Sequence, residues 1–185
     1  SSMLLGWVNF VLAAVFAAVA WIYNYRGKRW MLLGNMMVAA SVAIPYIYGG
    51  AAVGGVDTPL LWFLAFTSFL ASTGREVVKT ISDVEGDEAR GVNSVARRLG
   101  SRVAALVGAT FFLAAVASTL LPIVTGRVGV VFSTLILIPD ILFVYAALRI
   151  ASDYAKGNAL RLKRLTLTGM VIGMLVFILG GVYRD

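Results

Sequence analysis

The sequence predicts an all-α fold, a polytopic bundle of transmembrane helices, and three observations support this prediction. Hydrophobic residues make up 60% of the 185-residue chain and charged residues only 14%, whereas soluble domains carry about 25% charged residues. Several apolar stretches have about the 20 residues that a helix needs to cross a bilayer. Basic residues gather in alternate connections between these stretches. Cysteine and histidine are both absent, which excludes disulfides, histidine-ligated metal sites and histidine general bases.

Six membrane spans are expected, within a single domain that covers residues 1–185. The first span has no basic flank before it and basic residues after it, so it is interpreted as a membrane helix and not as a signal peptide. The second contains Pro45 and several glycines, where a kink or early unwinding is tolerated if neighbouring groups satisfy the backbone. The expected spans are 3–23, 31–55, 58–74, 103–124, 128–148 and 165–183.

The charge of the connections predicts how the chain is oriented in the membrane. The first, third and fifth connections together hold all but two of the 16 Lys and Arg residues. Under the positive-inside rule, these three connections face the cytoplasm. We therefore expect an integral protein of the cell membrane, with the connection at residues 75–102 on the cytoplasmic side. The net charge of +7 does not by itself identify a binding partner. Because the chain is interpreted as a membrane protein, we expect it to contact lipid and not nucleic acid.

The long third connection contains the acidic stretch DVEGDEARG. If the third span continues as a helix, Glu76, Thr80, Asp83 and Asp87 follow at spacings of three or four residues and share one face. Carboxylates one turn apart repel each other unless a cation lies between them. Oxygen ligands without His or Cys favour Mg²⁺, which commonly bridges carboxylates and substrate phosphates. Nearby basic residues could serve the remaining phosphate charge; they are Arg75, Lys79 and Arg90. A solvated loop of mixed charge is the alternative.

The segment YNYRGKR, at the end of the first span, also has two interpretations. Tyrosines and basic residues commonly anchor a helix at the membrane interface, and charge alone favours this interpretation. In the functional interpretation, Lys28 or Arg29 binds a phosphate. Tyr23 or Tyr25 then packs against the substrate or forms a hydrogen bond with it.

Among the polar residues within the spans, Asp140 and Asn35 require an explanation. Asp140 follows Pro139 near the middle of the fifth span, and an ionisable group at that depth is a functional candidate. A helix break at Pro139, with Asp140 neutral or paired, is the alternative, and the sequence does not decide between them. Asn35 in the second span needs a partner inside the bundle, and packing between helices is the favoured use.

The stretch KTISDVEGDEARGVNSVARRLG resembles the second aspartate-rich motif of the UbiA superfamily of intramembrane prenyltransferases. Asp83 and Asp87 match its two metal-binding aspartates, and Glu76 stands where members often carry another acidic residue. YNYRGKR, followed by Gly and Asn35, resembles the family's Tyr–Lys motif, with Lys28 at the lysine. The tail LKRLTLTGMVIGMLVFILGG is similar to the last helix of the family, so the resemblance covers most of the chain.

The chain departs from the family pattern in three places. Asn24 stands where the Tyr-x-x-x-Lys spacing has its tyrosine, which leaves Tyr23 and Tyr25 as candidates. Ser94 replaces the usual threonine after the second motif. The first aspartate-rich motif is absent. Because the family resembles a nine-helix bundle, the six spans correspond to its helices four to nine, and we expect the first three helices of the same protein to complete the metal site.

The resemblance implies Mg²⁺-dependent transfer of a prenyl group from an isoprenoid diphosphate to a lipid-soluble acceptor. The pattern is most similar to archaeal digeranylgeranylglyceryl phosphate synthases, which implies geranylgeranyl transfer to geranylgeranylglyceryl phosphate in ether-lipid synthesis. Aromatic prenyl transfer, of the 4-hydroxybenzoate or quinone type, is the alternative. The implied catalytic residues are Asp83, Asp87, Glu76 and Lys28, with Glu76 helping to remove a proton. The implied substrate-binding residues are Tyr23, Tyr25, Lys28, Arg29, Lys79 and Arg90.

Two other classes of protein fit the sequence less well. The CDP-alcohol phosphotransferases are six-helix membrane enzymes with a D-G-x-x-A-R string, but here Gly86 precedes Asp87, and the later aspartates of that motif are missing. A transporter or channel subunit predicts polar residues in several spans. Apart from Asp140, formal charges inside the expected spans are missing.

Overall fold

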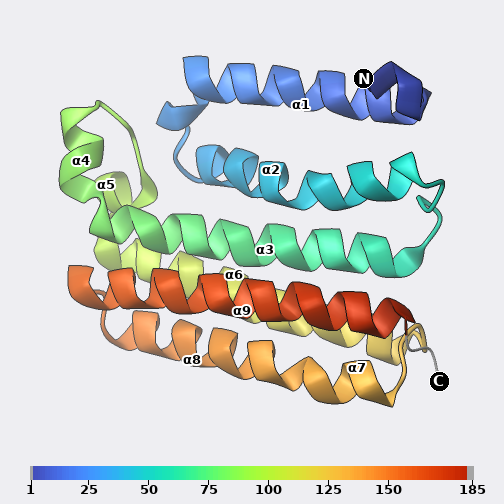
Figure 1. Ribbon diagram of the computed structural model, residues 1–185. Helices are drawn as coiled ribbons and strands as arrows, with labels where there is room; N and C mark the ends of the chain where they lie inside the picture. The colour runs from blue at the N-terminus through green and yellow to red at the C-terminus, as the bar shows by residue number, and fades with distance from the viewer. Residues whose placement is uncertain (1, 183–185) are drawn as a thin grey trace.

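Backbone polar groups inside a bilayer must bond to one another, and the chain meets this requirement with helices. The computed structural model describes residues 2–182, and over these residues it contains helices and no strand. The long helices lie side by side along one direction (Figure 1), which confirms the predicted all-α bundle. The elements are η1 (Ser2–Leu5), α1 (Trp7–Tyr25), η2 (Gly27–Arg29), α2 (Met31–Ala52), α3 (Pro59–Ser82), α4 (Val84–Ala89), α5 (Val95–Leu99), α6 (Ser101–Val124), α7 (Val130–Leu135), α8 (Leu137–Ser152) and α9 (Lys156–Val182).

Five helical segments in the described part of the chain are long and apolar enough to cross a membrane, and they match five of the six expected spans. The segments are α1, α2, α6, α7 with α8, and α9. The remaining expected span, 58–74, lies within α3. That helix has 24 residues, a length of about 36 Å, but its second half carries Arg75, Glu76 and Lys79. That α3 forms the sixth membrane span therefore stays a prediction.

Two boundaries differ from the expected ones. Helix α9 begins at Lys156 and not at 165, so basic residues expected in the fifth connection lie on its first turns. Leu, Lys and Arg, which dominate this stretch, are good helix formers. The expected fifth span is divided into α7 and α8 at Ile136. Pro139 explains the division, because it has no N–H to bond the carbonyl of Leu135. The expected end of the last span, residue 183, lies outside the described residues.

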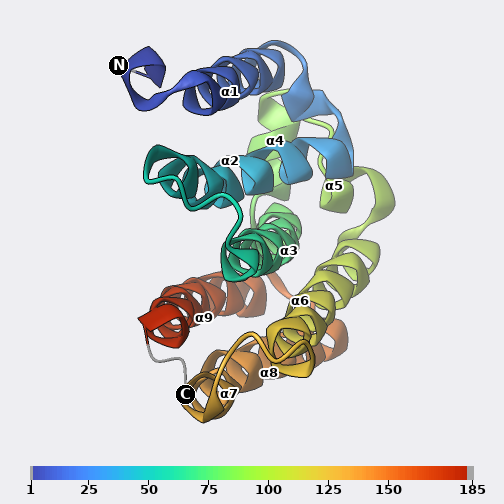
Figure 2. The ribbon, with the colours of Figure 1, turned by 90° about the vertical axis from the view of Figure 1, so that its right-hand side faces the viewer.

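Helix α3 is the central helix of the bundle. It packs against α2 on one side and against α6 and α9 on the other, while α1 packs against α2 (Figure 2). Small residues allow α3 and α6 to approach closely. A Cβ atom on Gly74 would lie 2.7 Å from Cδ1 of Phe112, and one on Gly108 would lie 2.6 Å from Cγ2 of Val78. Side chains larger than hydrogen therefore do not fit at either position without movement of a neighbour.

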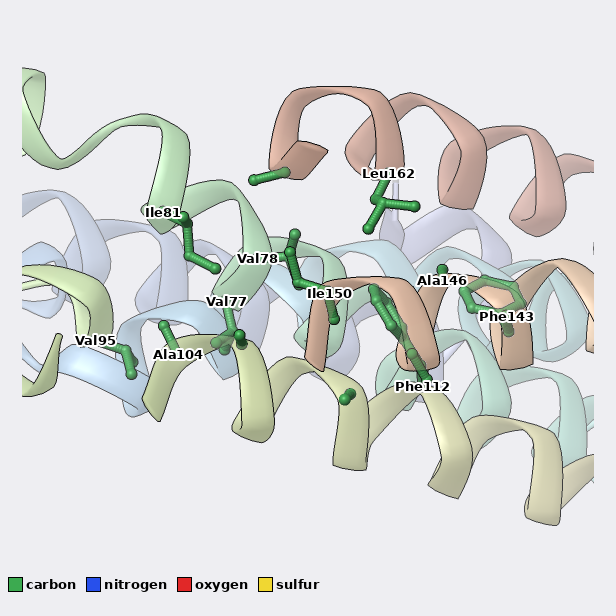
Figure 3. Close-up of a cluster of buried hydrophobic side chains, with 14 of the residues drawn as sticks. Val77, Val78, Ile81, Val95, Ala104, Phe112, Phe143, Ala146, Ile150 and Leu162 are labelled. Atoms are coloured by element: carbon green, nitrogen blue, oxygen red, sulfur yellow. The ribbon is translucent and has the colours of Figure 1, made fainter. Parts of the chain in front are cut away.

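The main hydrophobic core lies around the second half of α3. Val77, Val78 and Ile81 of α3 meet buried side chains of α5, α6, α8 and α9 (Figure 3). The partners labelled in Figure 3 are Val95, Ala104, Phe112, Phe143, Ala146, Ile150 and Leu162. This packing fixes the end of α3, and with it the position of the acidic segment that follows.

Asp140 is buried between α6 and α8. The hydroxyl of Thr119 donates a hydrogen bond to its Oδ2 atom at 2.8 Å. The residue lines a small interior cavity of about 40 Å³ near Pro139. Asp140 is thus paired beside a helix break, which lies one turn before Pro139, and it also faces an interior cavity, as the functional interpretation requires, so both interpretations stay open.

Candidate functional site: a charged cavity at one end of the bundle

The prediction of a shared face assumed that α3 continues through the acidic segment as one helix. The structure differs, because the helix is interrupted there. Helix α3 ends at Ser82, Asp83 forms the junction, and Asp87 lies in the short helix α4. The Ser82 hydroxyl donates to the Lys79 carbonyl at 2.8 Å, and such back-bonding by serine commonly bends helices. The N–H of Asp87 donates to the Asp83 carbonyl at 2.8 Å, which closes the turn. The two aspartates are therefore held by a turn at the end of α3.

A cavity of about 480 Å³ lies beside this turn. Its lining comes from the end of α1 with η2, the start of α2, the end of α3 and the segment 83–94. Seven of the predicted site residues line the cavity: Tyr23, Lys28, Glu76, Lys79, Asp83, Asp87 and Arg90. The fold thus brings the Tyr–Lys loop and the acidic segment, which are far apart in the chain, to one place.

Backbone contacts hold the loop that carries Lys28 against α2. A Cβ atom on Gly34 would lie 2.5 Å from the carbonyl oxygen of Gly27, so glycine is required at position 34 for this approach. The N–H of Met31 donates to the carbonyl of Asn93 at 3.1 Å, which ties the start of α2 to the acidic connection. Two remote segments are therefore joined at the cavity wall.

Two predicted substrate-binding residues lie outside the cavity lining. Tyr25 is 66% exposed, and its ring stacks on Trp21 at a centroid distance of 5.5 Å. Arg29 is exposed and borders a separate surface depression beside Trp30. Tyr23 does line the cavity, and the Lys28 ammonium lies 5.9 Å from its ring centroid. Of the two candidate tyrosines, the structure places Tyr23 at the cavity.

The charged groups of the cavity differ in their pairing. Glu76 is buried, and its two oxygens accept hydrogen bonds from Arg75, at 2.9 Å, and from Lys79. Asp87 is 8% exposed and accepts a bond from Arg90 at 3.2 Å. Lys28 forms no ion pair with the carboxylates of residues 2–182. The cavity therefore holds one cation without an anionic partner in the described chain.

The two glutamates of the acidic segment face away from this chemistry. Glu85 and Glu88 are exposed, and Glu85 accepts a hydrogen bond from Lys156 of α9 at 2.7 Å. This hydrogen bond and the positive charge of Lys156 hold the pKa of the Glu85 carboxyl below its ordinary value. The contact connects α4 with the start of α9. Within the acidic segment, Asp83 and Asp87 line the cavity, and Glu85 and Glu88 do not.

The donor set around the turn suits a hard divalent cation. Asp83 and Asp87 offer carboxylate oxygens, and Mg²⁺ is commonly bound by one or two carboxylates together with substrate phosphates. Within residues 2–182, no group of three His, Cys, Asp or Glu side chains is close enough to hold a metal ion. This chain therefore offers two carboxylates to a metal at the cavity.

Sequence reasoning did not assign several other lining residues to the site. Asn35, Thr80 and Ser94 all line the cavity, beside Met31, Gly34 and Val92. Asn35 had a signal as a polar residue in an apolar stretch and as part of the match to the Tyr–Lys motif. Thr80 had one on the expected shared face, and Ser94 had one as a departure from the family pattern. Their convergence depends on contacts between segments that are remote in the sequence.

Fold and cavity together define a polytopic membrane protein with a charged cavity at one end of its helix bundle. A family model described as the UbiA prenyltransferase family matches residues 1–160. The chain belongs to this family, which confirms the predicted resemblance and disfavours the phosphotransferase and transporter alternatives.

Named relatives and a solved structure agree with this assignment. The chain is 34% identical to the digeranylgeranylglyceryl phosphate synthase of Archaeoglobus fulgidus over 85% of this chain and 55% of that protein. It is 31% identical to the enzyme of the same name from Thermococcus kodakarensis over 95% of this chain and 62% of that protein. A solved structure from work on digeranylgeranylglyceryl phosphate synthase in membranes matches with a TM-score of 0.87 and 27% identity, over 98% of this chain and 64% of that chain. The chain thus spans roughly three fifths of the length of these relatives.

Proposed function

We propose that the protein is a Mg²⁺-dependent prenyltransferase that moves a geranylgeranyl group from its diphosphate to geranylgeranylglyceryl phosphate, a step of archaeal ether-lipid synthesis. The observation that carries this proposal is one cavity that gathers two aspartates and three basic side chains at the end of an apolar bundle. The names of the relatives from Archaeoglobus fulgidus and Thermococcus kodakarensis support the choice of substrates.

The cavity residues would act on the leaving group. Asp83 and Asp87 would hold Mg²⁺, whose chemistry when bound is to neutralise charge on the diphosphate. Lys28, Lys79 and Arg90 would add positive charge where negative charge develops as the carbon–oxygen bond breaks. The bonding electron pair leaves with the diphosphate, and an allylic cation remains on the prenyl group. The acceptor hydroxyl oxygen then forms the new bond to carbon and loses its proton.

Glu76 is the candidate residue for that proton, and its contacts suggest a second role. Both of its oxygens accept bonds from cations, one from Arg75 and one from Lys79. A carboxylate held in this way orients its partners, so we propose that Glu76 also positions Lys79 at the cavity. Proton removal by Glu76 would require one of these bonds to open.

The surroundings of the cavity suit a reactive cation and a lipid substrate. An allylic cation needs a site that excludes water, and the apolar bundle next to the cavity provides such surroundings. The basic connections between α1 and α2, α3 and α6, and α8 and α9 all lie at the cavity end (Figure 1). By the positive-inside rule, we propose that the cavity opens to the cytoplasmic side of the cell membrane.

Further metal ligands would come from the part of the relatives' length that this chain does not span. We propose that helices from that part carry the first aspartate-rich motif and face Asp83 and Asp87 across the cavity. The acidic and basic groups described above would then form one half of the diphosphate site.

The test uses the protein at the full length of its relatives, with labelled geranylgeranyl diphosphate and Mg²⁺. Geranylgeranylglyceryl phosphate and 4-hydroxybenzoate are offered separately as acceptors. We expect label in the ether lipid, and its loss when a chelator removes the metal. Label on the aromatic acid alone would support the aromatic alternative. Absence of diphosphate release with both acceptors would contradict prenyl transfer.

Lys28 and Arg29 allow the effect of a positive charge at the cavity to be compared with that of one outside it. Lys28→Ala should lower kcat/KM for prenyl transfer by roughly 10²-fold, because it removes positive charge from the leaving-group site. Arg29→Ala removes the same charge from the neighbouring position, outside the cavity, and should change kcat/KM less than about threefold. Steady-state kinetics of both variants check this prediction. Equal losses in the two variants would mean that the loop acts through its overall charge.

A further inference from the structure

Two polar atoms at the cavity are buried without a hydrogen-bond partner. They are the hydroxyl oxygen of Ser94 and the amide nitrogen of Asn35. Ser94 is only 5% exposed, and both residues line the cavity. Buried polar groups in native proteins are almost always bonded, so each exception requires an explanation. Within residues 2–182 one other side chain, Ser72, has such an atom, and Ser72 is not part of the cavity lining.

Another residue takes one of the two N–H groups from which the Ser94 oxygen would normally accept a hydrogen bond. Ser94 is the residue before α5, a position where serine normally accepts a bond from the N–H of the second or third helical residue. Here the N–H of Ala96 donates to Oγ1 of Thr80 at 3.3 Å instead. Thr80 thereby ties α5 to α3. The Ser94 hydroxyl forms no capping bond and stays available at the cavity.

Backbone contacts join the segments that carry Asn35, Lys28 and Ser94, and all three residues line the cavity. The Met31–Asn93 hydrogen bond brings the residue before Ser94 to the start of α2, where Asn35 lies one turn further on. Gly34, next to Asn35, packs against the backbone of Gly27 and Lys28. The cavity lining that these joined segments form therefore offers an amide N–H, a hydroxyl and a cation without a carboxylate partner among the described residues.

These three groups share a chemical preference. An amide N–H can only donate, a hydroxyl can donate, and an ammonium carries positive charge. An oxygen with negative charge satisfies all of them, and phosphate oxygens are such acceptors. We propose that Asn35 and Ser94 form, with Lys28, a subsite that donates hydrogen bonds to non-bridging phosphate oxygens of a substrate. This subsite deepens the proposed function and rests on it.

Two substrates of the proposed reaction carry such oxygens, the prenyl diphosphate and the acceptor phosphate. The KM values for geranylgeranyl diphosphate and for geranylgeranylglyceryl phosphate distinguish them. A higher KM for one substrate in the subsite variants identifies that substrate as the occupant. Inorganic pyrophosphate and glycerol phosphate serve as soluble probes of binding to the full-length protein in the presence of Mg²⁺.

Ser94→Ala is the central variant, because function and stability should respond in opposite ways. Removing an unpaired buried hydroxyl should leave the melting temperature without ligand unchanged or raise it. Affinity for one of the two probes should fall by about tenfold, the value of a hydrogen bond to a charged acceptor. Ser94→Thr keeps a hydroxyl and should retain affinity. Asn35→Asp replaces the donor with an acceptor and should weaken binding at least as much as Ser94→Ala.

Ser72→Ala is the matched control, since it removes an unpaired buried serine hydroxyl away from the cavity. Its affinity for both probes should equal that of the wild type. Unchanged affinities and KM values in Ser94→Ala and Asn35→Asp, with probe binding intact in the wild type, would overturn the subsite alone. A melting temperature of Ser94→Ala several degrees below wild type would also overturn it, by assigning a structural role. Absence of probe binding by the wild type would overturn the proposed function and the subsite together.

Discussion

Asp83→Ala and Asp87→Ala should each lower prenyl transfer by the full-length protein by roughly 10³-fold while the fold is retained. Both carboxylates line the cavity. In the proposed mechanism, each variant removes a ligand from the Mg²⁺ that would neutralise the diphosphate. The fold should tolerate the loss. Loss of the Asp87 carboxylate leaves Arg90, whose side chain is 67% exposed and stays hydrated, so no buried charge is left unpaired.

The same short segment supplies matched controls. Glu85→Ala and Glu88→Ala remove the same charge from exposed positions, and they should change kcat/KM less than about threefold. Initial rates at several Mg²⁺ concentrations, together with melting temperatures, separate loss of metal binding from loss of fold. Mg²⁺-dependent turnover at wild-type rates in both aspartate variants would contradict the metal assignment.

Gly74→Val should destabilise the bundle by about 1–3 kcal/mol or more, through overpacking between α3 and α6. A Cβ atom at this position would lie 2.7 and 2.8 Å from two ring atoms of Phe112 and 3.0 Å from the carbonyl oxygen of Gly108. Phe112 is fully buried in the main core and cannot move aside without displacing its own neighbours. Because Glu76 and Lys79 follow on the same helix and Asp83 comes directly after its end, we also expect the cavity to distort and activity to fall.

Gly49→Val is the control: it tests whether the loss of stability comes from overpacking at position 74 or from any replacement of a helical glycine by valine. Gly49 also lies in a long helix, but no atom lies within 4 Å of a Cβ atom built on it. This variant should melt within a few degrees of the wild type in the same detergent. The overpacking account would be wrong if Gly74→Val matched the wild type in melting temperature and in elution from a sizing column.

Apolar length and charge spacing predicted much of the molecule. Apolar stretches of sufficient length marked five of the spans, since a bilayer requires this length of a helix. The aspartate pair, Lys28 and Arg90 were predicted as site residues, and they line one cavity. Their roles in chemistry stay predictions until variants are measured.

The remaining features depend on contacts that one segment of sequence cannot show. The choice of Tyr23 over Tyr25 depends on how α1 is rotated against its neighbours. The break of α3 at Ser82 depends on a local hydrogen bond that competes with the helix. Ser94 became a candidate because its hydroxyl is buried without a partner at a cavity that segments remote in the sequence form.

Binding of inorganic pyrophosphate, measured while Mg²⁺ is titrated, tests most directly whether the cavity is a metal–diphosphate site. The wild-type full-length protein is compared with the double variants Asp83→Asn/Asp87→Asn and Glu85→Gln/Glu88→Gln. For a metal–diphosphate site we expect binding that requires Mg²⁺, that the aspartate variant loses and that the glutamate variant keeps. Binding that is independent of Mg²⁺, or that is equal in the wild type and the aspartate variant, would contradict it.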